Sequence, residues 1–205
     1  MMDKVEFFDR WAPHYDTLLT SVFYQAVHVR LLDHVTLPAT AQVLEVGCGT
    51  GKLLNRLAQR YPTLTGVGVD LSPEMVTQAR KRTMYGDRLQ FCQHDVTALP
   101  FAPQTFDAAF CTISFLHYPD PVAALRAIAA VLKPDGHFYL ADFVPPPGWG
   151  PEVWRPGISP GGVAFYSAAA RADLAAQAAL RCDRHGHLLG PVMMTQFSPL
   201  PADQS

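Results

Sequence analysis

A glycine-rich segment and two acidic residues form the part of this sequence best suited to chemistry. Residues 47–51 read Gly-Cys-Gly-Thr-Gly, Glu45 stands two residues before them, and Asp70 follows 19 residues after them. Glycines in a tight turn let backbone N–H groups approach a ligand closely. A carboxylate about 20 residues further on can accept hydrogen bonds from both hydroxyls of a ribose. The combination predicts a ligand that contains a nucleoside.

The acid at position 45 and the glycine spacing distinguish between two kinds of nucleoside cofactor. A pyrophosphate disfavours a nearby carboxylate such as Glu45, whereas an ammonium and a sulfonium favour one. Dinucleotide folds use the pattern GxGxxG, but here the third glycine of that pattern is replaced by Lys52. Both features favour S-adenosylmethionine, and a nicotinamide-dependent oxidoreductase is the enzymatic alternative.

The elements around these residues predict an α/β fold with a doubly wound, mostly parallel sheet. Alternating apolar runs predict strands over 42–46, 65–69, 89–93, 106–112 and 137–143. Helices are predicted over 52–61, from Ser72 and from Asp120 to a stop before Pro134. Strand, helix, strand implies a right-handed parallel crossover, which places the ends of successive strands at one edge of the sheet.

The flanking segments complete a single domain over residues 1–205. Residues 1–35 are expected to form a helical cap split at Pro13, and 42–144 the cofactor-binding core. Residues 145–165 are rich in proline and glycine and predict an irregular loop, in which Trp149 and Trp154 either close over a substrate or cover the core. In the closing segment 166–205, Ser167 can cap a helix to Leu180, and a hairpin follows over 182–189 and 192–197.

Composition narrows the possible partners and the compartment. With 205 residues, 49% hydrophobic and 17% charged, the chain is typical of one globular domain. A net charge of -2 without a basic run argues against nucleic acid and anionic membranes, and no apolar run reaches the length of a membrane span. The four cysteines lack the spacing of a disulfide framework or a metal site, so we expect reduced thiols, no metal and a cytoplasmic location. The expected partner is a small molecule, and oligomeric state is left open.

Further motifs occur in a fixed order around the glycine segment. They are residues 43–51 (Val-Leu-Glu-Val-Gly-Cys-Gly-Thr-Gly), 68–75 (Gly-Val-Asp-Leu-Ser-Pro-Glu-Met), 95–101 (Asp-Val-Thr-Ala-Leu-Pro-Phe) and 132–136 (Leu-Lys-Pro-Asp-Gly). In this order and spacing, the chain from about Val43 to Phe143 resembles the class I S-adenosylmethionine-dependent methyltransferases. The resemblance is strongest to the small-molecule branch that includes quinone-biosynthesis enzymes. It implies a seven-stranded Rossmann-like sheet and transfer of a methyl group to an oxygen, nitrogen or carbon atom of a small acceptor.

The resemblance also implies roles for individual residues. Glu45, Gly47 and Gly49 would border the methionine moiety, within a cofactor loop that also contains Cys48 and Gly51. Asp70 would bind the ribose, and Leu71 and Met75 would lie beside the adenine. Asp95 and Val96 would face the polar edge of the adenine. The Thr112 carbonyl would bind the methionine ammonium, and Tyr15 would close over the methionine moiety. Asp70 and Asp95 could instead cap helices.

His117 is the candidate for a catalytic base, because it follows the fourth strand at the ligand-binding edge. The alternative is a packed, hydrogen-bonded histidine. The family's closing strands usually occupy more chain than remains here, so we expect a shortened C-terminal hairpin. Such a shortened wall would suit a non-catalytic S-adenosylmethionine-binding partner or regulatory protein.

Overall fold

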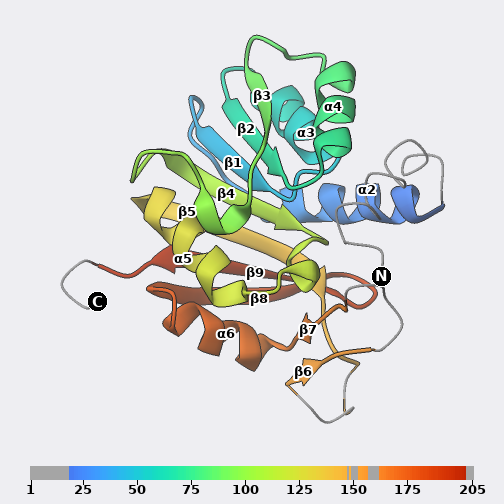
Figure 1. Cartoon of the computed structure of the whole chain (residues 1–205), viewed down its shortest axis with the longest axis vertical. Helices are drawn as coiled ribbons and strands as arrows, with labels where there is room; N and C mark the ends of the chain where they lie inside the picture. Colours follow the sequence, from blue (N-terminus) through green and yellow to red (C-terminus); the bar gives the residue numbers. More distant parts are fainter. Residues whose placement is uncertain (1–18, 147, 149–151, 157–161, 202–205) are drawn as a thin grey trace.

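The structure is a computed structural model that describes residues 19–146, 148, 152–156 and 162–201. Tyr15, Trp149 and the first half of the predicted helical cap lie outside the described residues. Within the described ranges, the chain folds around one large twisted sheet with helices on both faces (Figure 1).

Seven strands of the described chain form this sheet, in the order β3-β2-β1-β4-β5-β9-β8. They are β1 (Gln42–Val46), β2 (Thr65–Asp70), β3 (Leu89–Gln93), β4 (Phe106–Thr112), β5 (Leu132–Phe143), β8 (Leu180–Leu189) and β9 (Val192–Pro199). The first five pair in parallel, whereas β9 is antiparallel to both of its neighbours. The predicted doubly wound, mostly parallel α/β fold is confirmed.

Helices cover the two faces of the sheet and divide its core into two parts. The helices are α2 (Leu19–Leu32), α3 (Lys52–Arg60), α4 (Pro73–Arg82), α5 (Pro121–Val131) and α6 (Ala168–Ala176), with short 3₁₀ turns η2 (Val96–Ala98) and η3 (Phe115–His117). Side chains of α2, α3 and α4 pack on one face, and those of α5 and α6 on the other. In β1, Val43 and Leu44 are fully buried on opposite faces, so this central strand anchors both halves of the core.

The predicted helix starts are confirmed by their capping contacts. The Ser72 hydroxyl accepts a hydrogen bond from the Met75 N–H at 3.1 Å at the start of α4. Asp120 caps α5 and Ser167 caps α6 in the same way. Each cap satisfies an N–H that has no partner within its helix, which fixes where the helix begins.

Several boundaries differ from the prediction. Strand β5 begins at Leu132 instead of residue 137, because Leu132 pairs with Phe106 before an irregularity in register. Helix α6 ends at Ala176 instead of Leu180, because Ala179 adopts a left-handed backbone with φ of 54° ahead of β8. The segment predicted to be an irregular loop contains β6 (Val153–Trp154), which pairs with β7 (Phe165–Tyr166).

The closing hairpin is longer than expected. Strands β8 and β9 run for 10 and 8 residues and complete the seven-stranded sheet, so the expectation of a shortened hairpin is wrong. The apolar side chains of β9, from Val192 to Phe197, are buried and provide the packing that stabilises it. Among the described residues, we find no helix with the length and apolar character that crossing a bilayer requires.

Candidate active site

A cavity of about 530 Å³ opens where β1, β2, β3 and β4 end. This is the edge at which ligands bind in open parallel sheets. Many of the predicted site residues line it: Glu45, Gly47, Cys48, Gly49, Asp70, Leu71, Met75, Asp95, Val96, Thr112 and His117. The topology therefore brings together residues from four separate loops, as the sequence predicted.

The glycine turn after β1 needs glycine for two different reasons. Gly47 has a φ of 65°, and a Cβ added there would lie 2.0 Å from the Ser114 Oγ. Gly49 has a φ of 51°, but nothing lies within 4 Å of an added Cβ. A side chain at Gly47 would collide with the next loop, whereas at Gly49 the backbone conformation alone disfavours other residues.

Gly51 has a different environment from the other two glycines. It precedes α3 with a φ of 76°, and an added Cβ would lie 2.7 Å from the ring of Phe91. It is not among the cavity-lining residues. In this structure Gly51 allows α3 to start close against β3, and it contributes to the site through that packing.

Asp70 joins two loops of the cavity. One carboxylate oxygen, Oδ2, accepts a hydrogen bond from the Gly49 N–H at 2.8 Å, and Oδ1 accepts one from the Ser72 N–H at 3.0 Å. The second contact shows that Asp70 also supports the start of α4.

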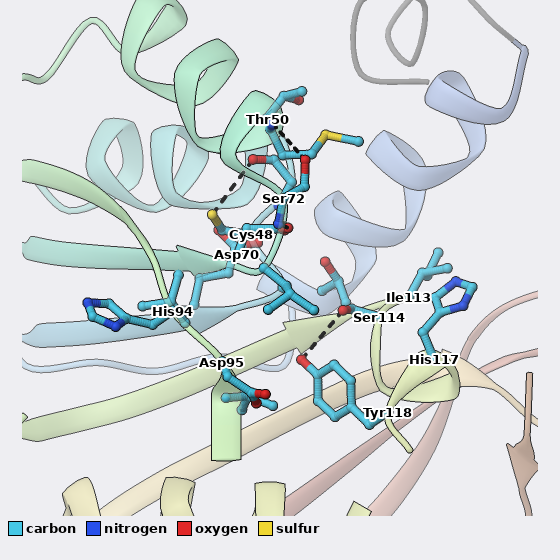
Figure 2. A pocket seen from close by; sticks show the side chains of 18 of the residues that line it. Cys48, Thr50, Asp70, Ser72, His94, Asp95, Ile113, Ser114, His117 and Tyr118 are labelled. Carbon is cyan, nitrogen blue, oxygen red and sulfur yellow. Dashed lines mark hydrogen bonds between the residues drawn. The ribbon is translucent and has the colours of Figure 1, made fainter. Parts of the chain in front are cut away.

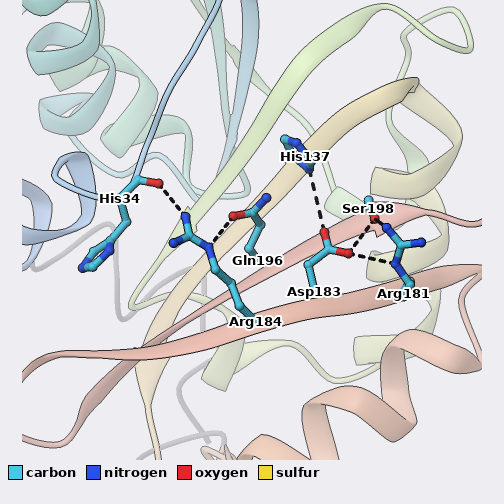
Figure 3. A network of polar contacts seen from close by, with 7 residues as sticks. All are labelled: His34, His137, Arg181, Asp183, Arg184, Gln196 and Ser198. Atoms are coloured by element: carbon cyan, nitrogen blue, oxygen red, sulfur yellow. Dashed lines mark hydrogen bonds and ion pairs between the residues drawn. The ribbon is translucent and has the colours of Figure 1, made fainter.

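Asp95 has a local capping role as well as a place in the cavity. Its Oδ1 accepts hydrogen bonds from the N–H and the hydroxyl of Thr97, each at 2.8 Å, and thereby caps η2. The side chain is exposed and lines the cavity (Figure 2). Capping and ligand binding are thus compatible at this position.

Glu45 is a buried carboxyl group at the base of the cavity. It is 1% exposed, and its Oε2 has no hydrogen-bond partner among the described residues. Burial, together with the charge of Asp70, raises its pKa well above the usual range. An unpartnered buried acceptor is costly in a folded protein, and a cation with N–H donors would both pair with it and favour its ionised form. The group therefore fits the ammonium of a methionine moiety.

The loop after β4 forms the opposite wall and contains a strained residue. Ile113 adopts a φ of 48°, which is uncommon for a β-branched residue, and its side chain lines the cavity near His117 (Figure 2). The Ser114 hydroxyl donates to the Tyr118 hydroxyl at 3.4 Å, next to Gly47. The turn η3, which carries His117, is held by the buried Asp142, whose Oδ2 accepts from the Leu116 N–H at 3.0 Å.

Several cavity residues were missed from the sequence. Tyr24 and His28 of α2 line the cavity, as do Lys52, Ser114 and Tyr118. Polar and apolar residues of α2 are not segregated to opposite sides of the helix, so its sequence does not identify a ligand-facing side. Ser114 and Tyr118 enter the cavity because the strained Ile113 turns the chain over Gly47.

Comparison with known proteins identifies the family. Residues 43–136 match the model of a methyltransferase domain. The chain is 33% identical over 144 residues to the demethylmenaquinone methyltransferase of Thermus thermophilus, covering 68% of this chain and 66% of that protein. It is 34% identical over 143 residues to the 2-phytyl-1,4-naphtoquinone methyltransferase of Thermosynechococcus vestitus, covering 68% and 64%. The chain belongs to the class I S-adenosylmethionine-dependent methyltransferases.

A solved structure supports the fold of this methyltransferase over nearly its whole length. The Haloferax volcanii methyltransferase solved in complex with the Trm112 methyltransferase activator superposes with a TM-score of 0.82 at 21% identity, covering 95% of this chain and 98% of that one. The match to the two quinone-type relatives spans just under two thirds of their own length. S-adenosylmethionine is the cofactor of this family, and the unpartnered carboxyl of Glu45 beside the glycine turn fits its positively charged end.

Proposed function

We propose that this methyltransferase transfers a methyl group from S-adenosylmethionine to an oxygen, nitrogen or carbon atom of a small molecule with a quinone- or phenol-like ring. The observation that carries the proposal is the single cavity in which the buried Glu45, the open turn at Gly49 and the carboxylate of Asp70 meet. The relatives named for demethylmenaquinone and 2-phytyl-1,4-naphtoquinone support the ring-containing acceptor.

In this proposal the residues predicted from the sequence keep their roles. Glu45 accepts hydrogen bonds from the methionine ammonium with the carbonyl of Thr112, and Asp70 binds the ribose. Leu71 and Met75 flank the adenine, and Asp95 faces its amino group. Together these residues hold the cofactor at both ends, so that the methyl group has a single direction of approach.

Catalysis would come mostly from alignment and from exclusion of water. The cofactor supplies an electrophilic methyl group on a sulfonium, and the protein must place a nucleophile in line with it. His117 would accept a proton from acceptors that must lose one. His117→Gln should then lower turnover of phenolic acceptors and leave cofactor affinity unchanged, and a normal rate across pH would remove this base from the mechanism.

We also propose that the described part of the 145–165 segment around Trp154 and Phe165 roofs the acceptor. Trp154 of β6 packs edge-on against Phe165 of β7, with ring centroids 5.2 Å apart, and Phe165 contacts Phe143 at the end of β5. This aromatic row begins next to the carboxyl edge of the sheet. If the segment closes over the acceptor, tryptophan fluorescence of wild type but not of Trp154→Phe should change when acceptor is added to the cofactor complex.

Two measurements test the proposed function. Calorimetry with S-adenosylhomocysteine and with NAD separates the methyltransferase from an oxidoreductase, and binding of NAD alone would refute the proposal. A methyl-transfer screen with labelled S-adenosylmethionine over quinols, phenols, amines and small acids then tests turnover. Cofactor binding without turnover of any acceptor would favour a non-catalytic partner protein instead.

A further inference from the structure

Two residues that line the cavity each have a buried polar side-chain atom without a hydrogen-bond partner among the described residues. One is the Glu45 Oε2, which the cofactor accounts for. The other is the Nδ1 of His28, on α2. His28 is 7% exposed, and its other ring nitrogen, Nε2, lies 3.1 Å from the Thr112 Oγ1. The imidazole is therefore held in place at one nitrogen and unsatisfied at the other, which is costly unless a ligand completes it.

The position of His28 separates it from the adenosine side of the cavity. In the sheet, β4 lies on one side of β1, and β2 and β3 lie on the other. Figure 2 shows His94 and Asp95, which follow β3, apart from Ile113 and His117, which follow β4. Through its contact with Thr112, His28 belongs to the side formed by α2 and the end of β4. This is the side away from the proposed adenine site.

Side chains on this side of the cavity provide a surface against which an aromatic ring can pack. Ile113 and the ring of Tyr24 provide apolar surface. Among the described lining residues, Lys52 is the only lysine or arginine, and it comes from the start of α3. Lys52 and Arg56 of α3 carry the positive charges that act on His28, and neither α2 nor the loop after β4 adds a lysine or arginine to the described lining.

His28 itself is uncharged in the folded protein. Burial, with the nearby charges of Arg56 and Lys52, lowers its pKa to about 3. A neutral imidazole adds no positive charge next to a sulfonium. It offers either a donor N–H or an acceptor lone pair, and a hydroxyl group can bind to either.

We propose that His28 binds the methyl acceptor, with its Nδ1 hydrogen-bonded to a hydroxyl group on an aromatic ring. This inference rests on the proposed function and specifies its substrate class. The His28 side chain thereby orients the ring against Ile113 and directs the hydroxyl-bearing edge toward the cofactor.

The test compares two probes of similar size, 1-naphthol and 1-methylnaphthalene, on protein saturated with S-adenosylhomocysteine. Affinities are measured for wild type, His28→Phe and His28→Gln, with His34→Phe as the matched control, because His34 follows the same helix but does not line the cavity. Wild type and His34→Phe should prefer 1-naphthol by about tenfold, the contribution of one well-placed hydrogen bond. His28→Phe should lose this preference, and His28→Gln should retain part of it.

Three outcomes would overturn the inference. In the first, wild type binds neither probe or does not prefer 1-naphthol. In the second, His28→Phe keeps the preference for 1-naphthol. In the third, His28→Phe loses affinity for S-adenosylhomocysteine instead. The last would place His28 on the cofactor. If His28→Phe does not fold, His28→Leu takes its place. Failure of the proposed function is seen separately, as wild type that does not bind S-adenosylhomocysteine or transfers no methyl group to any acceptor.

Discussion

The Asp70 Oδ2 lies 2.8 Å from the N–H of Gly49, so the acid that ends β2 holds the glycine turn that follows β1. The same carboxylate accepts from the Ser72 N–H at the start of α4. One side chain therefore fixes the relative positions of two loops that line the same cavity. A substitution at Asp70 acts both on ligand contacts and on the shape of the turn.

Asp70→Ala should weaken binding of S-adenosylmethionine by roughly tenfold to a hundredfold or more. A hydrogen bond to a charged group is worth about 1.5 to 3 kcal/mol, and two ribose hydroxyls would lose their acceptor. The affinity of Asp70→Asn should lie between those of wild type and Asp70→Ala. Its amide keeps one oxygen acceptor but places an NH₂ group against the N–H of either Gly49 or Ser72. Calorimetry measures the affinities, with the exposed Asp173→Ala as control. Unchanged affinity in a folded Asp70→Ala protein would contradict the binding mode.

Substitution of three glycines by alanine should separate backbone strain from steric collision. Gly86 has no positive φ and open space at its Cβ position, so Gly86→Ala should leave stability nearly unchanged. Gly49→Ala should lower the free energy of unfolding by about 1 to 2 kcal/mol, because its only effect is to place alanine in a left-handed backbone conformation. Gly47→Ala should lower the free energy of unfolding by more than Gly49→Ala does and should abolish cofactor binding, because its Cβ would displace the Ser114 side chain. Urea unfolding and calorimetry measure both effects, and equal costs at positions 47 and 49 would disagree with the geometry.

The buried imidazole of His28 should make the protein less stable in mild acid. In the unfolded chain the histidine takes up a proton near pH 6.5, whereas in the folded protein it stays neutral down to about pH 3. The unfolded state therefore binds more protons between these values, and the free energy of unfolding falls as the pH is lowered through this window. At pH 4 the loss attributable to His28 is about 3 kcal/mol relative to pH 7.

Urea unfolding of wild type and His28→Phe at pH 7 and pH 4 measures this effect. The variant should lose less stability on acidification than wild type does. Asp142 acts in the opposite direction, because burial raises its pKa to about 6 and its protonation below that pH favours the folded state. That contribution is present in both proteins and cancels in the difference. An identical acid-induced loss in the two proteins would show that His28 is not buried as a neutral group.

The strands and helices of the core could be predicted because their signals are local. Ser72, Asp120 and Ser167 each cap a helix through contacts three residues away, which the sequence displays directly. The five parallel strands are short apolar runs bounded by turn residues. Their order and handedness then bring Glu45 and Asp70 to one edge.

The parts that could not be predicted depend on contacts between distant segments. A side chain at position 47 would collide with Ser114, and this conflict arises only because β4 lies beside β1 in the fold. Gly51 looks like a ligand-binding glycine in the sequence, but its neighbour is the ring of Phe91 on β3. His28 could not be distinguished because the polar residues of α2 do not gather on one side, and its place in the cavity is seen only when α2 packs beside the end of β4.

Ile113→Gly should change stability by less than about 1 kcal/mol, although it removes a whole partly buried side chain. A left-handed backbone costs a β-branched residue about 1 to 2 kcal/mol, and glycine releases this strain while losing a similar amount of packing. The matched control is Ile128→Ala in α5, a fully buried residue without strain, which should cost about 2 to 5 kcal/mol.

Ile113→Gly should also bind S-adenosylhomocysteine normally but have a higher KM for an aromatic acceptor, because Ile113 lines the cavity beside His117. Strained backbone residues cluster at functional sites, where the surrounding contacts hold them in place. Urea unfolding and steady-state kinetics measure the two effects. If Ile113→Gly destabilises the protein as much as Ile128→Ala does, the conformation at Ile113 is not strained, and its place in the cavity reflects packing alone.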